Sequence, residues 1–321
     1  MCIRDSGDSA PEEVVKGAIL AKKEGVDVIL SGDENLIKSY LGNEKIPVIN
    51  YPQVISMDDD PAKAIRSNKD SSIIGALNLV KEKKADAVFS AGSTGATLIG
   101  AISVLGKIKG VTRPTIASVL PGKEKEVILV DSGANLEVKP KVLYQFAIMG
   151  SKLSELLFDI ENPRIGLINN GEESSKGREL EKATFKLLKS SQLNFIGNVE
   201  GKDFANSKVD VFVTDGFTGN VVLKTLQGVA KLQQDLISKS LKENLFKPLL
   251  IPVKNAISPV KSMLNPNSTN GSYLLGVNGL VIIGHGSSNS EAIKNALLFT
   301  NRAVEKRFIN KFTEVSSELW M

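Results

Sequence analysis

Short runs rich in β-branched and apolar residues alternate along the chain with longer segments whose apolar positions recur with helical period. This alternation is typical of strand–helix–strand crossovers, so it predicts an α/β fold with a mostly parallel sheet flanked by helices. The expected strands cover residues 26–30, 46–50, 86–90, 115–120, 126–131, 164–169, 209–214 and 279–284. The expected helices cover residues 12–24, 71–84, 95–105, 138–158, 177–189, 218–242 and 288–308.

The distribution of glycine and proline gives no sign of a linker between domains. Neither residue gathers in one stretch, and no internal repeat divides the 321 residues. We therefore expect residues 1–321 to form a single domain, long enough to contain two lobes.

The first residues differ from this pattern. Residues 1–6 have no strand character, whereas Gly7-Asp-Ser-Ala-Pro11 is typical of a turn that follows a strand and begins a helix. Two interpretations are open: a frayed terminus, or a first strand that is missing or replaced. The domain prediction treats residues 1–6 as a non-native leader.

Composition narrows the chemistry that the chain can perform. Lysine and arginine number 40 against 36 acidic residues, and the net charge of +4 is too small to indicate a nucleic-acid partner. Cys2 is the only cysteine and His285 the only histidine, which excludes internal disulfides, thiolate zinc sites and histidine-cluster metal sites. No stretch approaches the roughly 18 apolar residues of a membrane span, and the first residues lack the layout of a signal peptide. We expect a cytoplasmic protein.

Five of the expected strands run directly into small, polar turns that contain glycine, at residues 90–95, 131–135, 169–173, 215–220 and 284–288. Because the carboxyl ends of parallel strands lie at one edge of a sheet, the turns are expected to converge there. Exposed amides and the dipole of each following helix favour an anion such as phosphate. The alternative is that these residues serve only their own turns and helix caps.

Nucleotide-binding motifs are approached but not completed. Gly284-His-Gly-Ser-Ser-Asn289 lacks the third small residue of the dinucleotide motif. Residues 171–178 have the lysine and glycine of a P-loop in the wrong order. The sequence therefore gives no support for NAD or ATP as a cofactor.

The side chains at the turns that are candidates for chemistry are Lys176, Asn220, Lys224, His285, Asp131 and Asp215. Lys176 lies in a glycine-flanked loop that opens a helix, while Asn220 and Lys224 are expected to share one helix face. The lone histidine stands between two glycines after an apolar strand, which favours a functional role. The two aspartates end apolar strands, where each either caps its turn or orients a lysine or hydroxyl.

Residues 239–265 interrupt the α/β pattern. They hold five lysines against one acid, Glu243, and three prolines divide them into short apolar helical pieces. Such a protruding basic amphipathic arm, at about 239–268, suits an anionic membrane surface or an acidic protein partner. The alternative is a helical arm packed in a homodimer.

Seven motifs follow one another in order along the chain: Ser90-Ala-Gly-Ser-Thr-Gly-Ala96, Gly106-Lys-Ile-Lys-Gly-Val-Thr-Arg-Pro114, Asp131-Ser-Gly-Ala-Asn135, Gln145-Phe-Ala-Ile-Met-Gly150, Gly197-Asn-Val-Glu-Gly201, Asp215-Gly-Phe-Thr-Gly-Asn-Val-Val-Leu-Lys224 and Gly284-His-Gly-Ser-Ser288. In this order they resemble the phosphate acyltransferase (PlsX) family of bacterial phospholipid synthesis, in register from about residue 7 to about residue 308. The resemblance implies a fold similar to the isocitrate and isopropylmalate dehydrogenases, a homodimer, no nucleotide cofactor and peripheral membrane association. It also implies transfer of a fatty acyl group from acyl carrier protein to inorganic phosphate, which gives acyl phosphate.

The chain departs from the family pattern in two places. The family opens with a strand and Asp-Ala-Met-Gly-Gly-Asp-x-Ala-Pro, where this chain has Met1-Cys-Ile-Arg-Asp-Ser-Gly-Asp-Ser-Ala-Pro11. We therefore expect the strand and one glycine to be absent, and attribute this to an erroneous start of the sequence. The second departure is Asn169-Asn-Gly-Glu-Glu-Ser-Ser-Lys-Gly177, which resembles the family's Asn-Ile-Gly-x-Glu-x-x-Lys-Gly and keeps its glutamate, lysine and final glycine.

The reaction that the resemblance implies, taken with the residue types at the turns, leads to a hypothesis for the chemistry. His285 donates a proton to the leaving thiol, and Lys176 or Lys224, with Asp215, completes the catalytic set. Helix-start amides near residues 94–95 and 218–219 stabilise charge on the thioester oxygen. The residues expected to bind phosphate or substrate are Gly92, Ser93, Thr94, Gly95, Asp131, Asn135, Gly216, Thr218, Gly219, Asn220, Gly286 and Ser287.

Other function classes stay open from the sequence. A coenzyme A-dependent phosphotransacylase would use coenzyme A in place of the carrier protein. A non-catalytic membrane-associated scaffold would bind vesicles and partner proteins without releasing a thiol. A dehydrogenase of similar fold is disfavoured because the dinucleotide motif is incomplete.

Overall fold

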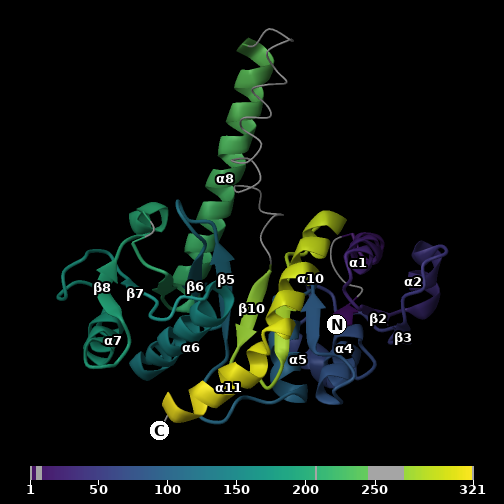
Figure 1. The fold of residues 1–321 in the computed structure, drawn as a ribbon, viewed down its shortest axis with the longest axis horizontal. Coiled ribbons are helices and arrows are strands. Elements are labelled where there is room, and N and C mark those ends of the chain that lie inside the picture. The colour runs from purple at the N-terminus through teal and green to yellow at the C-terminus, as the bar shows by residue number, and fades with distance from the viewer. Residues whose placement is uncertain (1, 5–8, 207, 245–270, 320–321) are drawn as a thin grey trace.

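The computed structural model describes residues 2–4, 9–206, 208–244 and 271–319, which form a layered α/β body from which one long helix projects (Figure 1). The centre of the body is one eleven-stranded sheet, in the order β3-β2-β1-β4-β11-β10-β5-β6-β9-β7-β8. In that order the strands are β3 (Val48–Asn50), β2 (Ile29–Gly32), β1 (Cys2–Arg4), β4 (Ala87–Ser90), β11 (Leu280–Ile283), β10 (Ser272–Leu275), β5 (Thr115–Leu120), β6 (Val127–Val130), β9 (Val211–Val213), β7 (Ile165–Ile168) and β8 (Phe195–Val199).

The sheet contains two parallel blocks that run in opposite directions. Strands β3, β2, β1, β4 and β11 form one block, and β6, β9, β7 and β8 form the other. Between them, β10 pairs antiparallel with β11 and β5, and β5 pairs antiparallel with β6. The expected mostly parallel α/β architecture is confirmed. The expectation that all five glycine-containing turns share one carboxyl edge is wrong, because two of the turns leave one block and three leave the other.

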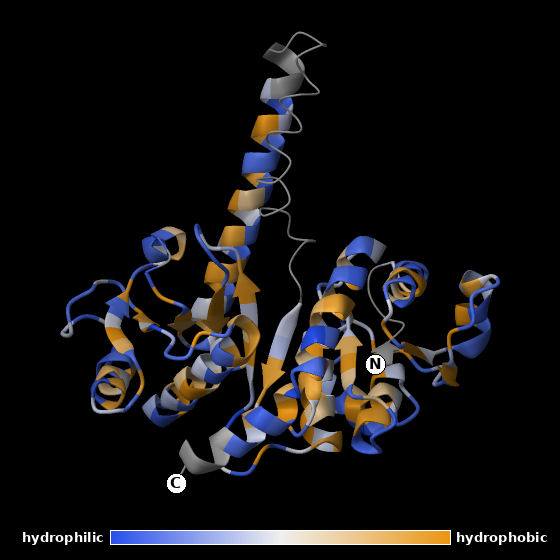
Figure 2. Ribbon diagram, in the orientation of Figure 1, coloured by the Kyte–Doolittle hydropathy of each residue, from blue (hydrophilic) through white to orange (hydrophobic). Residues whose placement is uncertain are grey.

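Helices flank the sheet. They are α1 (Glu12–Lys23), α2 (Glu34–Leu41), α3 (Pro61–Ser67), α4 (Ser72–Lys81), α5 (Thr94–Val104), α6 (Pro140–Phe158), α7 (Glu179–Lys189), α8 (Gly216–Asn244), α10 (Ser290–Glu305) and α11 (Phe308–Leu319), with a short 3-10 helix at Gly201–Asn206. Apart from the projecting α8, their apolar faces turn toward the sheet, so the orange positions of Figure 2 in the body gather in its interior.

Alternation along the strands fills a core on each face of the sheet. In β4, Ala87 and Phe89 belong to the core beneath α1, α6 and α10, whereas Val88 belongs to the core beneath α4 and α5. Successive strand residues point to opposite faces, which is why one continuous apolar run supplies both cores. The sheet is thereby buried on both sides, as parallel strands require.

Every strand and helix expected from the sequence is present, with ends that differ by a few residues. The expectation that the first residues lack a strand is wrong, because β1 pairs in parallel with β2 and β4 through Ile3 opposite Leu30 and Phe89. The elements that the sequence analysis did not predict are β1, β8, β10, α2, α3, α11 and the 3-10 helix at Gly201–Asn206. Most of these are short, so their pairing and packing depend on neighbours that are distant in sequence.

The helix α8 projects from the body (Figure 1) and begins at the turn after β9. Its 29 residues extend over about 43 Å. Of the basic arm expected at about 239–268, residues 239–244 are the last residues of α8, and the remainder lies outside the described residues.

Candidate active site

Asp131 follows β6 and organises the turn behind it. Its buried side chain accepts hydrogen bonds at Oδ1 from the amides of Ala134 at 2.8 Å, Gly133 at 3.1 Å and Ile116 at 3.3 Å. At Oδ2 it accepts from the amide and from Nδ2 of Asn135, both at 2.8 Å. Burial raises the pKa of Asp131, and these donors oppose the rise. Because both oxygens are occupied, Asp131 holds the turn in shape instead of meeting a ligand directly.

The first turn of α8 packs against that turn without a gap. A Cβ atom at Gly219 would lie 1.8 Å from the carbonyl oxygen of Asp131, and one at Gly216 would lie 2.7 Å from the amide nitrogen of Asn135. Only glycine fits at these two positions, so contact within the protein explains them. They bring the start of α8 against the end of β6.

The amides at the start of α8 already have partners. The Thr218 amide donates to Oδ1 of Asp215 at 2.7 Å, and the Gly219 amide donates to the backbone oxygen of Asp215 at 2.9 Å. The Gly216 amide donates to the backbone oxygen of Asn135 at 2.7 Å. The amides at 218–219, which were expected to receive a substrate charge, thus donate to Asp215, which caps the helix with its own oxygens.

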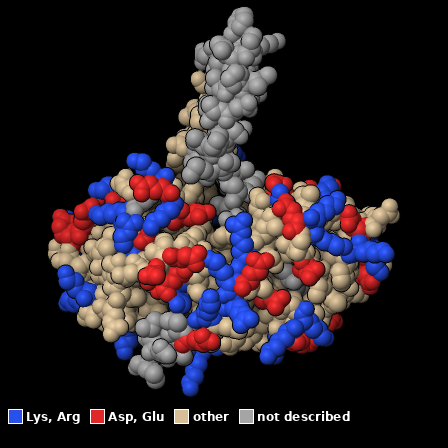
Figure 3. Space-filling model, viewed as in Figure 1, with Lys and Arg blue, Asp and Glu red and all other residues tan. Residues whose placement is uncertain are grey.

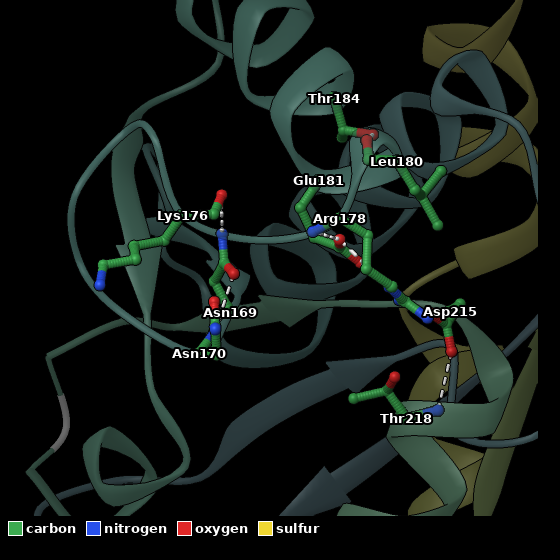
Figure 4. A network of polar contacts seen from close by, with 9 residues as sticks. All are labelled: Asn169, Asn170, Lys176, Arg178, Leu180, Glu181, Thr184, Asp215 and Thr218. Carbon is green, nitrogen blue, oxygen red and sulfur yellow. Dashed lines mark hydrogen bonds and ion pairs between the residues drawn. The ribbon is translucent and has the colours of Figure 1, made fainter.

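An arginine that the sequence analysis did not single out holds Asp215. Arg178 donates through Nη2 to Oδ2 of Asp215 and, at 2.5 Å, to Oε1 of Glu181 (Figure 4). Hydrogen bonds to Glu181 and Asp215, both buried, raise the pKa of Arg178 above its ordinary value. Arg178 thereby joins the start of α7 to the start of α8. Arg178 stands two residues after Lys176. The feature that could have singled it out from the sequence is the preference of buried carboxylates for arginine as their partner.

Lys176 points away from this network (Figure 4). Its side chain is exposed, while its backbone stays in the loop through hydrogen bonds with Glu173 and Asn169, both at 3.1 Å. The loop that contains it therefore contributes Arg178, and not Lys176, to the contacts around Asp215.

The start of α5 offers amides toward a ligand. Ser93 caps the helix by accepting from the Ala96 amide at 3.3 Å. The amides of Thr94 and Gly95 have no acceptor within the described parts of the chain. They lie at the positive end of the helix dipole, where an anionic oxygen is favoured.

His285 and Lys224 come together from two distant segments. Nε2 of His285 lies 3.4 Å from Nζ of Lys224, which projects from the third turn of α8. On the other side of the ring, Nδ1 lies 2.7 Å from Oγ of Ser287 and 3.3 Å from the Ser287 amide. Ser287 therefore orients the imidazole, and the lysine brings a positive charge to it.

A cavity of about 340 Å³ opens over the antiparallel strands β10 and β5. The predicted site residues that line it are Thr94, Asn220, Lys224 and His285. The predicted residues outside the described lining are Lys176, Asp215, Gly92, Ser93, Gly95, Asp131, Asn135, Gly216, Thr218, Gly219, Gly286 and Ser287. Several of these shape the turns and helix starts that present the lining residues.

The sheet register explains why turns from opposite blocks meet at one cavity. Ile283 at the end of β11 lies opposite Ser272, which lies opposite Ser118 in β5. Val130 at the end of β6 lies opposite Ala117, one residue from Ser118. The carboxyl ends of β11 and β6 are therefore nearly level, although the two strands point in opposite directions.

Two parts of the lining were not found from the sequence. One is a row of serines, Ser272, Ser118 and Ser132, and the other is an apolar wall that includes Leu136 and Phe217. The serines read as ordinary strand and turn residues, because their grouping arises only from the pairing of β10 with β5. The apolar residues are indistinguishable in sequence from core residues.

These groups favour an anion and an apolar group side by side. Within the described residues, no group of three or more His, Cys, Asp or Glu side chains is placed to hold a metal ion. On the face seen in Figure 3, basic and acidic side chains intermingle over the body, so this face presents no broad basic surface for a nucleic acid. The chemistry of the cavity thus rests on Lys224, His285, hydroxyls and amides.

Comparison with known proteins identifies the family. A family model described as "Fatty acid synthesis protein" matches residues 6–311. The phosphate acyltransferase of Halothermothrix orenii is 42% identical over 313 residues, covering 94% of this chain and 94% of the relative. That of Pelotomaculum thermopropionicum is 44% identical over 312 residues, covering 94% of this chain and 90% of the relative.

The chain belongs to the phosphate acyltransferase family. The resemblance seen in the seven motifs is thereby confirmed, and the chain is an acyltransferase. Membership of an enzyme family sets aside the non-catalytic scaffold. None of the helices in the described residues is long and apolar enough to cross a membrane.

Solved structures support the fold of this phosphate acyltransferase family member. A phosphotransacetylase from Streptococcus pyogenes matches with a TM-score of 0.61 at 18% identity, covering 95% of this chain and 94% of the other. A 4-hydroxythreonine-4-phosphate dehydrogenase from Klebsiella pneumoniae matches with a TM-score of 0.55 at 13% identity, covering 94% and 99%. At these identities the likeness concerns the fold alone. The predicted likeness to the isocitrate and isopropylmalate dehydrogenases stays a prediction.

Proposed function

We propose that this enzyme transfers a long-chain fatty acyl group from acyl carrier protein to inorganic phosphate, forming acyl phosphate for phospholipid synthesis. The observation that carries the proposal is the meeting of two kinds of surface in one cavity. Lys224, His285 and the start of α5 form a polar end that suits phosphate. Leu136, Phe217 and their apolar neighbours form a wall that suits an acyl chain.

The apolar wall continues out of the cavity along α8. Phe217 and Val221 line the cavity and are 61% and 51% exposed. Val229, Leu232 and Leu236 follow on the same helix face, and both leucines are 57% exposed. Within the cavity, Phe217 and Val221 extend the apolar wall for an acyl chain, whereas the leucines farther out are available to an apolar partner.

The chemistry balances without a cofactor. Hydrogenphosphate, HPO₄²⁻, attacks the thioester carbonyl, so that a C–O bond forms and the C–S bond breaks. The products are the acyl phosphate dianion and the carrier thiol, and the balance closes because hydrogenphosphate releases its proton to solvent while the sulfur takes up one proton. Lys224 and the α5 amides stabilise the charge that develops on the oxygens. His285, beside Lys224, carries a proton to the sulfur.

The proposal includes a cytoplasmic homodimer that contacts an anionic membrane peripherally. The exposed leucines of the outer part of α8, Leu232 and Leu236, support the dimer. The five lysines in residues 239–265 support attraction to anionic lipid or to an acidic carrier protein. Changing Leu249, Leu250 and Ile251 to Ser tests the membrane contact by vesicle flotation, and unchanged binding would remove it.

A coenzyme A-dependent phosphotransacylase is the second candidate. The likeness in fold to the Streptococcus pyogenes phosphotransacetylase favours it, since that relative's name denotes acyl transfer involving phosphate. The apolar wall of the cavity, with Leu136, Phe217 and Val221, argues for a fatty chain, although it does not distinguish a carrier protein from coenzyme A. The donor therefore has to be identified by experiment.

The deciding experiment measures phosphate-dependent release of free thiol from palmitoyl-acyl carrier protein, palmitoyl-coenzyme A and acetyl-coenzyme A. Hydroxylamine converts the acyl phosphate to a hydroxamate and so identifies the product. We expect both signals with the carrier thioester, dependent on phosphate. Preference for acetyl-coenzyme A, or inhibition of the carrier reaction by free coenzyme A, would favour the second candidate. Release of thiol without phosphate would contradict both.

A further inference from the structure

Three serine hydroxyls form a continuous row in the lining of the cavity. Ser272 comes from β10, Ser118 from β5 and Ser132 from the turn after β6. Oγ of Ser118 lies 2.8 Å from Oγ of Ser272 and 2.7 Å from Oγ of Ser132. Ser118 and Ser132 are almost fully buried, at 4% and 5% exposure. The scheme above gives none of the three a part in the reaction.

The direction of the hydrogen bonds in this row follows from counting protons. The buried end is fixed, because Ser132 donates to the backbone oxygen of Ile116 at 3.2 Å and Ser118 donates to Ser132. A hydroxyl has one proton, so Ser118 has none left for Ser272, and Ser272 must be the donor between them. What Ser272 Oγ offers to the cavity is therefore lone pairs, which accept a hydrogen bond from a ligand.

The acceptor end of the row lies in the same cavity as Lys224 and His285. Ser272 lies opposite Ile283 in the β10–β11 ladder, and Ile283 stands two residues before His285. His285 in turn contacts Lys224, and both line the same cavity as Ser272. A ligand bound there meets positive charge and a hydrogen-bond acceptor together, which fits an anion that still bears a proton.

We propose that Ser272, held by Ser118 and Ser132, accepts a hydrogen bond from the P–O–H group of hydrogenphosphate. This hydrogen bond selects phosphate over sulfate. The inference rests on the proposed function, since it concerns the group that accepts the acyl chain. At neutral pH hydrogenphosphate keeps one proton, whereas sulfate keeps none. A sulfate oxygen facing Ser272 would place two acceptors against each other, with no proton between them.

The same hydrogen bond gives the nucleophile a fixed orientation. Hydrogenphosphate has one protonated and three unprotonated oxygens, and binding of the protonated oxygen at Ser272 turns the others away from the serine row. The unprotonated oxygens then face Lys224 and the thioester, which is the arrangement that attack requires. Ser272 is thus a positioning and specificity residue, and its effect is expected mainly on the use of phosphate.

The test compares phosphate and sulfate with the full chain. KM for phosphate and Ki for sulfate are measured in the thiol-release assay, and we expect the wild type to prefer phosphate by about 10-fold or more. Ser272→Ala is expected to reduce that preference about 10-fold by weakening phosphate and not sulfate. Ser272→Thr keeps the hydroxyl and should keep the preference. Ser31→Ala is the matched control, because Ser31 is a buried strand serine in β2 that donates to the backbone of Ser72 at 2.9 Å.

Calorimetric titration of the wild type with phosphate and with sulfate gives the same comparison without turnover and without any variant. Equal Kd values for the two ions would overturn the inference, as would an unchanged preference in Ser272→Ala that unfolds at the wild-type temperature. Preference for phosphate in the titration, together with no thiol release from palmitoyl-acyl carrier protein, would support the selectivity and contradict the proposed function.

Discussion

The contact of 3.4 Å between Lys224 and His285 places a cation beside the chain's only imidazole, in the cavity that also contains the apolar wall. In the proposed reaction the leaving group is a thiol with an ordinary pKa near 8.5, which departs tolerably as a thiolate. We therefore expect His285→Ala to lower kcat by about 10- to 100-fold without abolishing turnover, at the low end for a general acid. KM for phosphate should change little. A complete loss of activity in a folded variant would show that protonation of the sulfur is essential.

Lys224 is expected to act on phosphate itself. Removing an ammonium that contacts an anion costs about 1.5 to 3 kcal/mol, so Lys224→Ala should raise KM for phosphate by about 10-fold or more. Lys231→Ala removes the same charge from an exposed position two turns further along α8 and serves as the control. Steady-state kinetics with phosphate varied at saturating acyl donor decide the matter. Equal effects of the two variants would mean that only the general charge of α8 matters.

Arg178 is expected to act through Asp215. In Arg178→Ala the buried Asp215 loses its arginine and keeps the Thr218 amide at Oδ1, so the start of α8 is held less firmly. We expect KM for phosphate to rise while kcat falls less, and the free energy of unfolding to fall by about 1 to 3 kcal/mol. Arg178→Lys should restore only part of both, because an ammonium cannot reproduce the guanidinium fork.

Lys176→Ala is the informative comparison for that variant, because it removes a positive charge from the same loop. The side chain of Lys176 points away from Asp215, so its effect on KM should be much smaller than that of Arg178→Ala. A rise in KM for phosphate equal to that of Arg178→Ala would mean that Lys176 also acts at the site.

The pair Lys176 and Arg178 also marks how far sequence reasoning reaches at this scale. Residue types and spacing predicted a cationic loop that opens a helix, and the structure has one. They did not predict which of two cations faces α8, because that depends on the direction in which the loop leaves β7. Asn220 and Lys224 were predicted correctly to share a helix face, since helical periodicity fixes that relation locally.

Among the elements, the start of α8 leaves the least space for an added side-chain atom. A Cβ atom at Gly219 would meet the carbonyl oxygen of Asp131 at 1.8 Å, so Gly219→Ala must push α8 away from the end of β6. We expect a loss of about 3 kcal/mol in the free energy of unfolding, with loss of activity. Gly228→Ala is the matched control, because open space surrounds Gly228 in the same helix. There alanine should stabilise by about 0.5 to 1 kcal/mol. Urea unfolding measures both, and similar values would refute the packing argument.

Strong periodicity explains which elements were predictable. The long helices and the apolar strands can be recognised from local sequence periodicity. In contrast, β1 and β10 are strands of three and four residues that form because neighbouring strands pair with them. The antiparallel pairing of β10 with β11 and β5 is equally a tertiary property. It decides that the sheet reverses direction in its middle, and thereby that four of the five turns meet across a reversal instead of along one edge.

For the whole molecule, the reversal of the sheet has a functional consequence. Ligands of open α/β sheets bind where carboxyl ends of strands meet at a change in topology. Here the ends of β11 and β6 come level at β10 and β5, and the cavity opens at that place. From the same place α8 leads outward (Figure 1), and its residues Phe217, Val221 and Lys224 line the cavity.

The outer part of α8 is expected to bind a second copy of the chain. Leu232 and Leu236 are each 57% exposed on a helix that projects from the body, and burying one leucine contributes about 1.5 to 3 kcal/mol. A two-fold axis beside them would bury the same residues from both copies. Changing both to Glu would place like charges together and should yield a monomer, measured by sedimentation velocity at micromolar concentration.

Lys231→Glu alters charge on a neighbouring face of the same helix and should leave the dimer in place. If the double variant remains a dimer, the two leucines bind another partner. If the double variant also binds vesicles as the wild type does, that partner is not the membrane. Phe217 and Val221 lie nearer the cavity than the two leucines, so the monomer should still bind phosphate. Loss of phosphate binding together with loss of the dimer would instead mean that the second copy completes the site.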